Sequence, residues 1–186
     1  MGGQVALIAG ATGLIGRQIA AHLQRLGWEV IGLARRPVPG GAVRLIGVDL
    51  TDAGDCRSKL AALANATHVF YTARYDHPEG VAESVAINAA MLSNLVEAVE
   101  PAAAGLRHIH AVHGTKYYGH HLGPLAVPTR ENDPRAPAPN FYYAQEDYLR
   151  ERQRGKRWTY STSRPHTYCD ASWNEPRNIG LLIAVY

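Results

Sequence analysis

The sequence is poor in cysteine and has no long hydrophobic run. Its two cysteines, Cys56 and Cys169, give neither a disulfide framework nor a paired metal-ligand spacing, which fits a reducing compartment. No stretch approaches the ~18 consecutive apolar residues of a membrane span, and no basic start followed by a long apolar segment indicates a secretory signal. We therefore expect a soluble, cytoplasmic protein that makes no membrane contact.

The sequence also lacks any block of charge of one sign. It carries 19 Lys and Arg against 16 Asp and Glu, which gives a formal net charge of +3 and a pI near 9.0. Because this small excess is spread along the chain, nucleic-acid binding is not favoured, and a phosphate-rich ligand explains the balance more simply. The length of 186 residues and the apolar fraction of 46% suit one globular domain.

A recognisable metal-ligand set is absent as well, although the sequence contains nine histidines. His108, His110 and His113 cluster around one expected strand, and His120 and His121 follow nearby. No Asp, Glu or Cys completes a zinc-binding pattern with them. We expect strand and loop histidines and no metal site.

What the sequence does contain is a glycine-punctuated turn near its N-terminus, from Val5 to Gly16. An apolar run typical of a buried parallel strand leads directly into Gly10, Gly13 and Gly16, and the apolar spacing then continues as a helix. In a dinucleotide-binding turn these glycines allow the sharp turn, the approach of a pyrophosphate and the close packing of the helix. The N–H groups and positive dipole end of the helix would face the phosphates. The pattern predicts dinucleotide binding.

The end of the second expected strand, from Glu29 to Ala34, indicates which dinucleotide is bound. Proteins specific for NAD place an acid there to bind the ribose 2′-hydroxyl, whereas this strand continues into Arg35 and Arg36. Two guanidinium groups suit a 2′-phosphate, and no acid is present to repel it. The alternative is that both arginines are solvated residues before a loop. We expect the cofactor to be NADP(H).

Strands and helices alternate along the rest of the chain. This alternation predicts an α/β fold with a doubly wound parallel sheet, a Rossmann fold whose ligands bind at the carboxyl ends of the strands. The 21-residue stretch 119–139, rich in Pro, Gly and His, is expected to be a binding loop at that edge. The expected strands are 42–48, 68–73, 105–112 and 160–163, and the expected helices are 52–64, 81–99 and 140–154.

Several further residues are candidates for cofactor binding because they lie in the glycine turn or near strand ends. Asp49 could instead be a turn residue at the end of its strand. Asn88, inside an expected helix, is a candidate buried hydrogen-bonding residue with a structural role. The full set of cofactor candidates is Gly10, Thr12, Gly13, Leu14, Gly16, Arg35, Arg36, Asp49, Leu50, Thr72, Ala73, Val112, Tyr142 and Tyr168.

Tyr142, Tyr143 and Lys116 are the candidates for catalysis. A hydride-transferring reductase needs a donor at the carbonyl oxygen, where negative charge develops, and a tyrosine hydroxyl near a lysine ammonium can serve. Neither tyrosine has a lysine four residues later, because those positions are Glu146 and Asp147. The alternatives are that the tyrosines pack as helix-start aromatics and that the lysine is solvated.

The run Asn140-Phe141-Tyr142-Tyr143-x-x-Glu146-Asp147, with a lysine supplied by Gly114-Thr115-Lys116, resembles the progesterone 5β-reductase/iridoid synthase-like family of extended short-chain dehydrogenase/reductases. The resemblance covers nearly the whole chain. It implies NADPH-dependent 1,4-reduction of enones, from small enones to Δ4-3-ketosteroids. It also implies that Tyr142 is the catalytic tyrosine and Lys116 its partner. Register against the usual Tyr-x-x-x-Lys pattern would instead choose Tyr143, which is therefore kept as the alternate.

The chain departs from that family at several positions. His113 stands where the family usually has Thr, Tyr117 where it has His, and Ala73 where many plant members have Trp. Family members are about twice as long, so we expect residues 1–186 to form the NADP-binding domain, with the start of a substrate-binding region from about residue 165. The part that closes over the substrate would then be largely missing.

Three functions remain open at this point. The first is an NADPH-dependent enone reductase, an enzyme with a small-molecule enone as its substrate. The second is a non-catalytic NADP-binding module, such as a redox sensor or a partner subunit. The third, a carbonyl reductase or epimerase of the wider superfamily, is disfavoured because the usual Tyr-x-x-x-Lys pair is absent. A homodimer is a possible assembly, and nucleic acid is not an expected partner.

Overall fold

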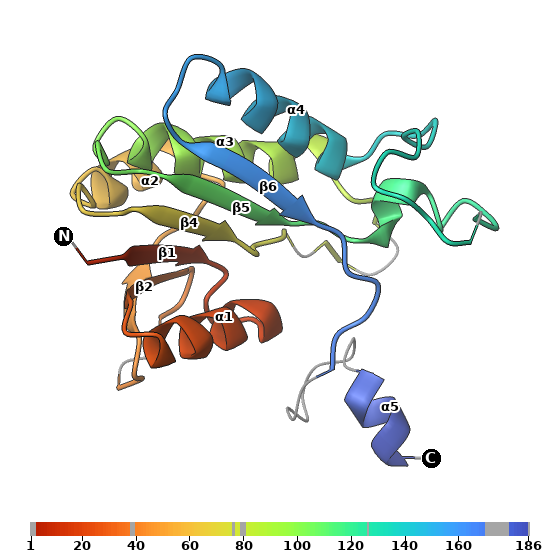
Figure 1. Cartoon of the computed structure of the whole chain (residues 1–186), viewed down its shortest axis with the longest axis horizontal. Helices are drawn as coiled ribbons and strands as arrows, with labels where there is room; N and C mark the ends of the chain where they lie inside the picture. The colour runs from red at the N-terminus through yellow and green to blue at the C-terminus, as the bar shows by residue number, and fades with distance from the viewer. Residues whose placement is uncertain are drawn as a thin grey trace.

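The described residues form a parallel sheet of six strands with helices on both faces (Figure 1). A computed structural model describes residues 3–37, 40–75, 77–78, 81–125, 127–169 and 179–185. The strand order is β3-β2-β1-β4-β5-β6, and every neighbouring pair is parallel. This order has its reversal between β1 and β4, where ligands bind in such sheets. The expected doubly wound α/β fold is confirmed.

The strands and helices follow one another as the sequence predicts, with some shifted ends. The strands are β1 (Val5–Ala9), β2 (Glu29–Ala34), β3 (Arg44–Gly47), β4 (His68–Tyr71), β5 (His108–Val112) and β6 (Thr159–Ser163). The helices are α1 (Leu14–Arg25), α2 (Ala53–Leu60), α3 (Val85–Val99), α4 (Phe141–Gln153) and α5 (Ile179–Val185), with a 3-10 turn, η1, at Thr115–Tyr118. No helix in these described ranges is long and apolar enough to cross a membrane.

Polar side chains explain why three helices are shorter than predicted at their N-terminal ends. Asp52 accepts hydrogen bonds from the N–H groups of residues 54 and 55, so it is the N-cap of α2 and not its first residue. Ser84 caps α3 through Ile87 N, which makes the expected start at residue 81 wrong by four residues. Asn140 caps α4 through Tyr142 N. A side chain that caps a helix lies outside its first turn.

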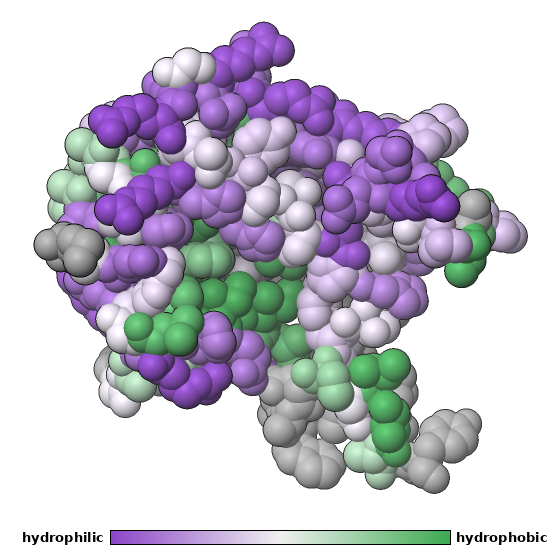
Figure 2. All heavy atoms as spheres, in the orientation of Figure 1, coloured by the Kyte–Doolittle hydropathy of each residue, from purple (hydrophilic) through white to green (hydrophobic). Residues whose placement is uncertain are grey.

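Two apolar layers hold the sheet between its helices. In β1, side chains alternate strictly between the two faces, because successive residues of a strand point in opposite directions. Leu7 belongs to the larger cluster under α2, α3 and α4, whereas Ile8 belongs to the smaller cluster under α1. Figure 2 shows apolar side chains gathered where α1 meets the sheet. The central strand β1 is therefore buried along its whole length.

The turn between β1 and α1 brings the helix very close to the sheet. Gly10 has φ +79°, a conformation that L side chains rarely adopt, and a Cβ there would lie 2.8 Å from Thr72 Oγ1. A Cβ at Gly16 would lie 2.2 Å from the carbonyl oxygen of Gly10. This confirms the packing role expected for Gly16. The glycines bring the N-terminus of α1 directly against the carboxyl end of β1.

Replacing Gly16 by alanine should therefore destabilise the domain strongly. The added methyl group collides with backbone that cannot move without displacing β1 or α1, which we expect to lower the free energy of unfolding by about 2–4 kcal/mol. Gly41→Ala is the matched control, because a Cβ at Gly41 meets nothing within 4 Å. Urea unfolding of both variants measures the difference, and equal stabilities would contradict the close packing.

Candidate functional site

The larger candidate site is a cavity of about 440 Å³ at the carboxyl edge of the sheet. Residues of the β1–α1 turn, the segments after β2, β3 and β4, and one residue of α3 form its walls. These segments meet because parallel strands end at the same edge. The lining residues are Gly10, Thr12, Gly13, Leu14, Leu33, Ala34, Arg35, Val48, Leu50, Thr72, Ala73, Arg74, Met91 and Tyr168. The structure thus brings together most residues that the sequence predicted for cofactor binding.

Five of the predicted cofactor residues do not line this cavity, and three of them, Gly16, Arg36 and Asp49, do not line the neighbouring second cavity either. Gly16 lies under the turn and serves packing. Arg36 is exposed. The Asp49 carboxylate accepts hydrogen bonds from Thr51 N at 2.9 Å and Thr51 Oγ1 at 2.8 Å, as expected of a turn residue. These hydrogen bonds, helped by the charge of Arg35, hold the pKa of Asp49 below its ordinary value.

The chemistry of the cavity wall suits the diphosphate of a dinucleotide. Gly13 is the N-cap of α1. Because it has no side chain, it cannot accept a hydrogen bond from the first N–H groups of the helix. The turn holds its shape through Gly13 N, which donates to the Gly10 carbonyl at 3.0 Å. Beside the turn, Thr72 Oγ1 donates to the Ala9 carbonyl at 2.7 Å and holds the end of β4 against β1. Backbone can therefore approach an anion closely.

A second cavity, of about 240 Å³, adjoins the first. Thr72, Ala73, Arg74 and Tyr168 line both cavities. The remaining walls come from the segment after β5, the start of α4 and the segment after β6, namely Val112, His113, Gly114, Thr115, Lys116, His120, Phe141, Tyr142, Gln145, Pro165 and His166. Val112, Tyr142 and Lys116, which the sequence predicted for the site, thus lie in this second cavity.

Tyr142 is held in this cavity by the start of α4. The Asn140 side chain accepts from Tyr142 N at 3.0 Å and donates to the Lys116 carbonyl at 2.8 Å, so one amide ties the helix start to the turn that carries the lysine. A Cβ at Gly114 would lie 3.1 Å from the Tyr142 hydroxyl. The hydroxyl therefore lies directly against the backbone of the β5 exit.

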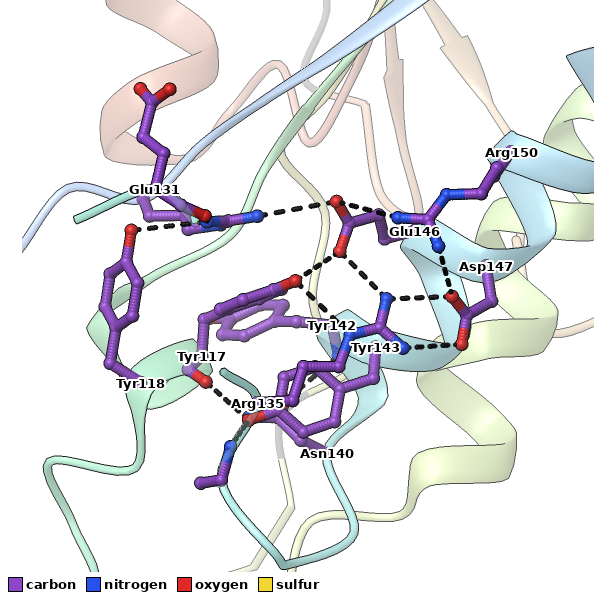
Figure 3. A network of polar contacts seen from close by, with 12 residues as sticks. Tyr117, Tyr118, Glu131, Arg135, Asn140, Tyr142, Tyr143, Glu146, Asp147 and Arg150 are labelled. Carbon is purple, nitrogen blue, oxygen red and sulfur yellow. Dashed lines mark hydrogen bonds and ion pairs between the residues drawn. The ribbon is translucent and has the colours of Figure 1, made fainter. Parts of the chain in front are cut away.

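Tyr143, the alternate donor, has its hydroxyl in a different place. That hydroxyl accepts from Ala136 N at 2.8 Å and donates to the Tyr117 carbonyl (Figure 3). These bonds attach the loop before α4 to η1. Of the two neighbouring tyrosines, only Tyr142 is among the residues that line the second cavity. The Tyr143 hydroxyl is thus bonded to two backbone groups of neighbouring segments, whereas Tyr142 lies at the second cavity.

Lys116 forms part of a charged group at the junction of the two cavities. Its ammonium lies 2.9 Å from Glu83, and Arg74 lies 3.0 Å from the other oxygen of the same carboxylate. Glu83 comes from the segment before α3, and no motif in the sequence pointed to it. One carboxylate thus holds two cations beside the ends of β4 and β5.

Glu146, four residues after Tyr142, is the centre of a buried ionic network (Figure 3). It is 8% exposed, accepts from the Tyr117 hydroxyl at 2.5 Å, and lies 3.0 Å from Arg135 and 3.4 Å from Arg164. Burial alone would raise the pKa of Glu146, but these hydrogen bonds and the arginine charges outweigh burial and hold the pKa below its ordinary value. Arg135 also binds Asp147.

Sequence reasoning did not identify these partners of Glu146. Arg135 and Arg164 lie far from Glu146 along the chain or in an irregular loop, where periodicity carries no information.

The expectation that Asn88 is a buried hydrogen-bonding residue is confirmed. Its side chain accepts from Tyr75 N at 2.9 Å and donates to the Ser84 carbonyl at 3.0 Å. In the part of the chain that the structure describes, no three His, Cys, Asp or Glu side chains gather in a way that could hold a metal ion.

The sequence matches a known protein family and resembles several characterised enzymes along nearly its whole length. Residues 6–167 match the model of the NAD dependent epimerase/dehydratase family. The chain is 37% identical over 200 residues to a 3-oxo-Δ4,5-steroid 5β-reductase of Arabidopsis thaliana, covering 98% of this chain and 50% of that protein. It is 34% identical over 200 residues to an (S)-8-oxocitronellyl enol synthase of Nepeta racemosa, with the same coverage. The chain thus spans about half the length of these relatives, and the resemblance seen in the sequence is confirmed.

The fold also matches solved structures. The Bordetella bronchiseptica enzyme WbmH, solved in complex with NAD+, superposes with a TM-score of 0.71 at 23% identity, covering 98% of this chain and 61% of that one. A structure described as a putative epimerase from Burkholderia cenocepacia superposes with a TM-score of 0.79 at 26% identity, covering 97% and 60%. These matches show the same Rossmann-like arrangement of sheet and helices.

The Glu146 network predicts how stability depends on pH. Because the pKa of Glu146 is lowered in the folded protein, its contribution is present above the ordinary value of 4.5 and is lost as the pH falls through the folded pKa. Glu146→Gln should lower the free energy of unfolding by about 1–3 kcal/mol near pH 7 and by less near pH 3. Denaturant titrations at several pH values measure this difference.

Glu151→Gln is the control for that experiment. Glu151 pairs with Arg154 at 2.9 Å, but the two side chains are 70% and 71% exposed. An exposed pair contributes little, so this variant should differ from wild type by less than about 0.5 kcal/mol. A difference for Glu146→Gln that stayed constant from pH 7 to pH 3 would show that its charge does not stabilise the fold.

Proposed function

Because the chain belongs to the NAD dependent epimerase/dehydratase family, we propose that it binds NADP(H) and reduces the C=C bond of α,β-unsaturated carbonyl compounds. The observation that carries this proposal is the position of Tyr142 in a cavity that shares four lining residues with the dinucleotide cavity. A relative named as a 3-oxo-Δ4,5-steroid 5β-reductase supports an oxidoreductase. Small enones and Δ4-3-ketosteroids are the substrate classes we propose.

The residues of the first cavity fit a nicotinamide dinucleotide. The helix α1 begins at Leu14, directly after its N-cap Gly13, and both residues line the cavity. Because Gly13 has no side chain, a diphosphate can come close to the N–H groups at the start of this helix. A solved structure with the same fold holds NAD+. Arg35 at the end of β2 favours NADP(H), because its guanidinium lines the cavity where the adenine ribose of such cofactors lies.

In the proposed reaction the chain positions and polarises the substrate. Bound NADPH would supply the hydride for the β-carbon, and water would supply the proton that completes the reduction at the α-carbon. The Tyr142 hydroxyl donates a hydrogen bond to the carbonyl oxygen, where negative charge develops as the enolate forms. Lys116, held by Glu83 and by the Asn140 contact with its carbonyl, contributes positive charge beside this oxygen. Both residues line the second cavity, Tyr142 from α4 and Lys116 from η1.

Arg35→Ala tests the choice of cofactor. Loss of a charge-assisted contact to the 2′-phosphate should weaken NADPH binding by about 1.5–3 kcal/mol and leave NADH binding nearly unchanged. Arg36→Ala is the matched control, because Arg36 carries the same charge but does not line the cavity. Fluorescence titrations of wild type and both variants with both cofactors measure the six affinities. Equal losses in the two variants would mean that only net charge matters, and equal binding of NADH and NADPH by wild type would contradict NADP specificity.

Tyr142→Phe tests the proposed donor. The change keeps the ring and removes the hydroxyl, so single-turnover hydride transfer from NADPH to 2-cyclohexen-1-one should slow by about a hundredfold to a thousandfold, with NADPH affinity unchanged. The rate should fall less with a more electrophilic enone, which needs less stabilisation of the enolate.

Tyr143→Phe is the control for the donor, since it removes a hydroxyl that bonds Ala136 N and the Tyr117 carbonyl. It should lower stability by about 1–2 kcal/mol and keep most of the hydride-transfer rate. A large loss of rate in Tyr143→Phe alone would assign the donor to Tyr143. Wild-type rates in both variants would contradict a tyrosine donor, and cofactor binding without any enone reduction would leave a non-catalytic NADP-binding module.

A further inference from the structure

His113, the residue directly after β5, is a buried histidine that the proposed reaction does not use. It is 2% exposed and lines the second cavity. Its ring stacks on the Tyr142 ring, with 4.7 Å between centroids and 28° between planes. It also stacks on Tyr117, with 6.4 Å between centroids and 12° between planes. The His113 ring therefore lies in contact with the residue that carries the proposed donor and with a residue of the ionic network.

The imidazole of His113 is neutral. Both ring nitrogens are buried without a hydrogen-bond partner among the described residues. Burial lowers the pKa of His113 to about 3, and the opposing charge of Glu146 does not restore it. The other charged or titratable groups that act on the ring are Arg164, His110 and Arg135. An uncharged, unbonded imidazole at this position offers its neighbours an aromatic surface and no hydrogen bond.

Tyr117, at the other end of this series of rings, is held firmly in place. Its hydroxyl donates to Glu146 at 2.5 Å, and the Arg164 guanidinium lies 3.5 Å from the centre of its ring. The backbone of His113 is fixed as well, since its N–H donates to the Ser163 carbonyl at 2.8 Å on β6. The surface against which Tyr142 stacks is therefore anchored to α4, to η1 and to the sheet.

We propose that His113 is a positioning residue that fixes the ring of Tyr142, and so its hydroxyl, by stacking. This inference rests on the proposed function, in which Tyr142 is the donor to the substrate. A donor must stay within a few tenths of an ångström of its productive position, because a misplaced hydrogen bond loses most of its effect on a transition state. Stacking restrains the plane of the Tyr142 ring without competing for its hydroxyl.

Variants of His113 distinguish the effect of its flat aromatic ring on the reaction rate from the effect of its ring nitrogens. His113→Phe keeps a flat aromatic ring and removes two unpartnered nitrogens, so it should keep the single-turnover rate with 2-cyclohexen-1-one within about threefold. His113→Leu keeps similar bulk without a flat ring, and His113→Ala removes the contact. Both should slow hydride transfer by about tenfold to a hundredfold with unchanged NADPH affinity. Thermal melts identify any variant that fails to fold. If His113→Ala fails to fold, the rate of the leucine variant tests the proposal.

A double variant shows whether His113 acts through Tyr142. In Tyr142→Phe, the additional change His113→Leu should cost less than about threefold, because the hydroxyl that it positions is already gone. Full additivity of the two losses would overturn the proposal. So would a leucine variant as fast as the phenylalanine variant, since the aromatic surface would then be irrelevant.

The contact can also be tested without activity. In the wild-type protein, the imidazole NMR signal of His113, assigned by its loss in His113→Phe, should not titrate between pH 5 and pH 8. In Tyr142→Ala, opening the ring to the cavity should restore titration near the ordinary value of 6.5. A wild-type His113 that titrates near 6.5 overturns the positioning contact. Absence of any enone reduction by wild type, with His113 still silent, overturns the proposed function and leaves the contact standing.

Discussion

The close approach of α1 to β1 at the glycine turn is the constraint on which the rest of the site depends. Gly10 and Gly16 allow a separation in which a Cβ at Gly16 would be only 2.2 Å from backbone oxygen. Because α1 begins so near the sheet, its N-terminus, the ends of β2 and β4, and the segment after β3 surround one cavity. A wider turn would move the helix N-terminus away from the phosphates that it can bind.

Side-chain amides extend this arrangement from the first cavity to the second. Asn88 in α3 holds the backbone after β4 at Tyr75, and Gln145 in α4 donates to the Asn88 carbonyl at 2.8 Å. Asn140 then ties the start of α4 to the turn at Lys116. Each amide bonds to the backbone of a neighbouring segment, so it adds rigidity without placing a charge in the core. The two cavities are in this way built on one connected framework.

The sequence predicts the parts of this framework that depend on local pattern. Apolar periodicity identified the strands, and the rule that parallel strands end at one edge placed Arg35, Thr72 and Ala73 at the first cavity. Apolar periodicity failed where a single polar side chain determines the start of a helix. The helix α3 begins after its N-cap Ser84, although the pattern predicted helix from residue 81. Glu83 was expected to lie in that helix, and its contact with Lys116, 33 positions away, could not be predicted because apolar periodicity carries no information about distant ionic partners.

The neighbouring tyrosines show how tertiary contacts resolve what register leaves open. Consecutive residues of a helix point about 100° apart, so only one of the two rings can face the second cavity while the other faces the loop at Ala136. Glu146, one turn after Tyr142, stands where a lysine is usual, and an unpaired carboxylate there would oppose charge on an enolate. Arg135 and Arg164 lie within 3.0 and 3.4 Å of it and compensate that charge. A helix that begins with a proposed donor can therefore carry a buried acid, because arginines from the preceding loop and from the segment after β6 neutralise it.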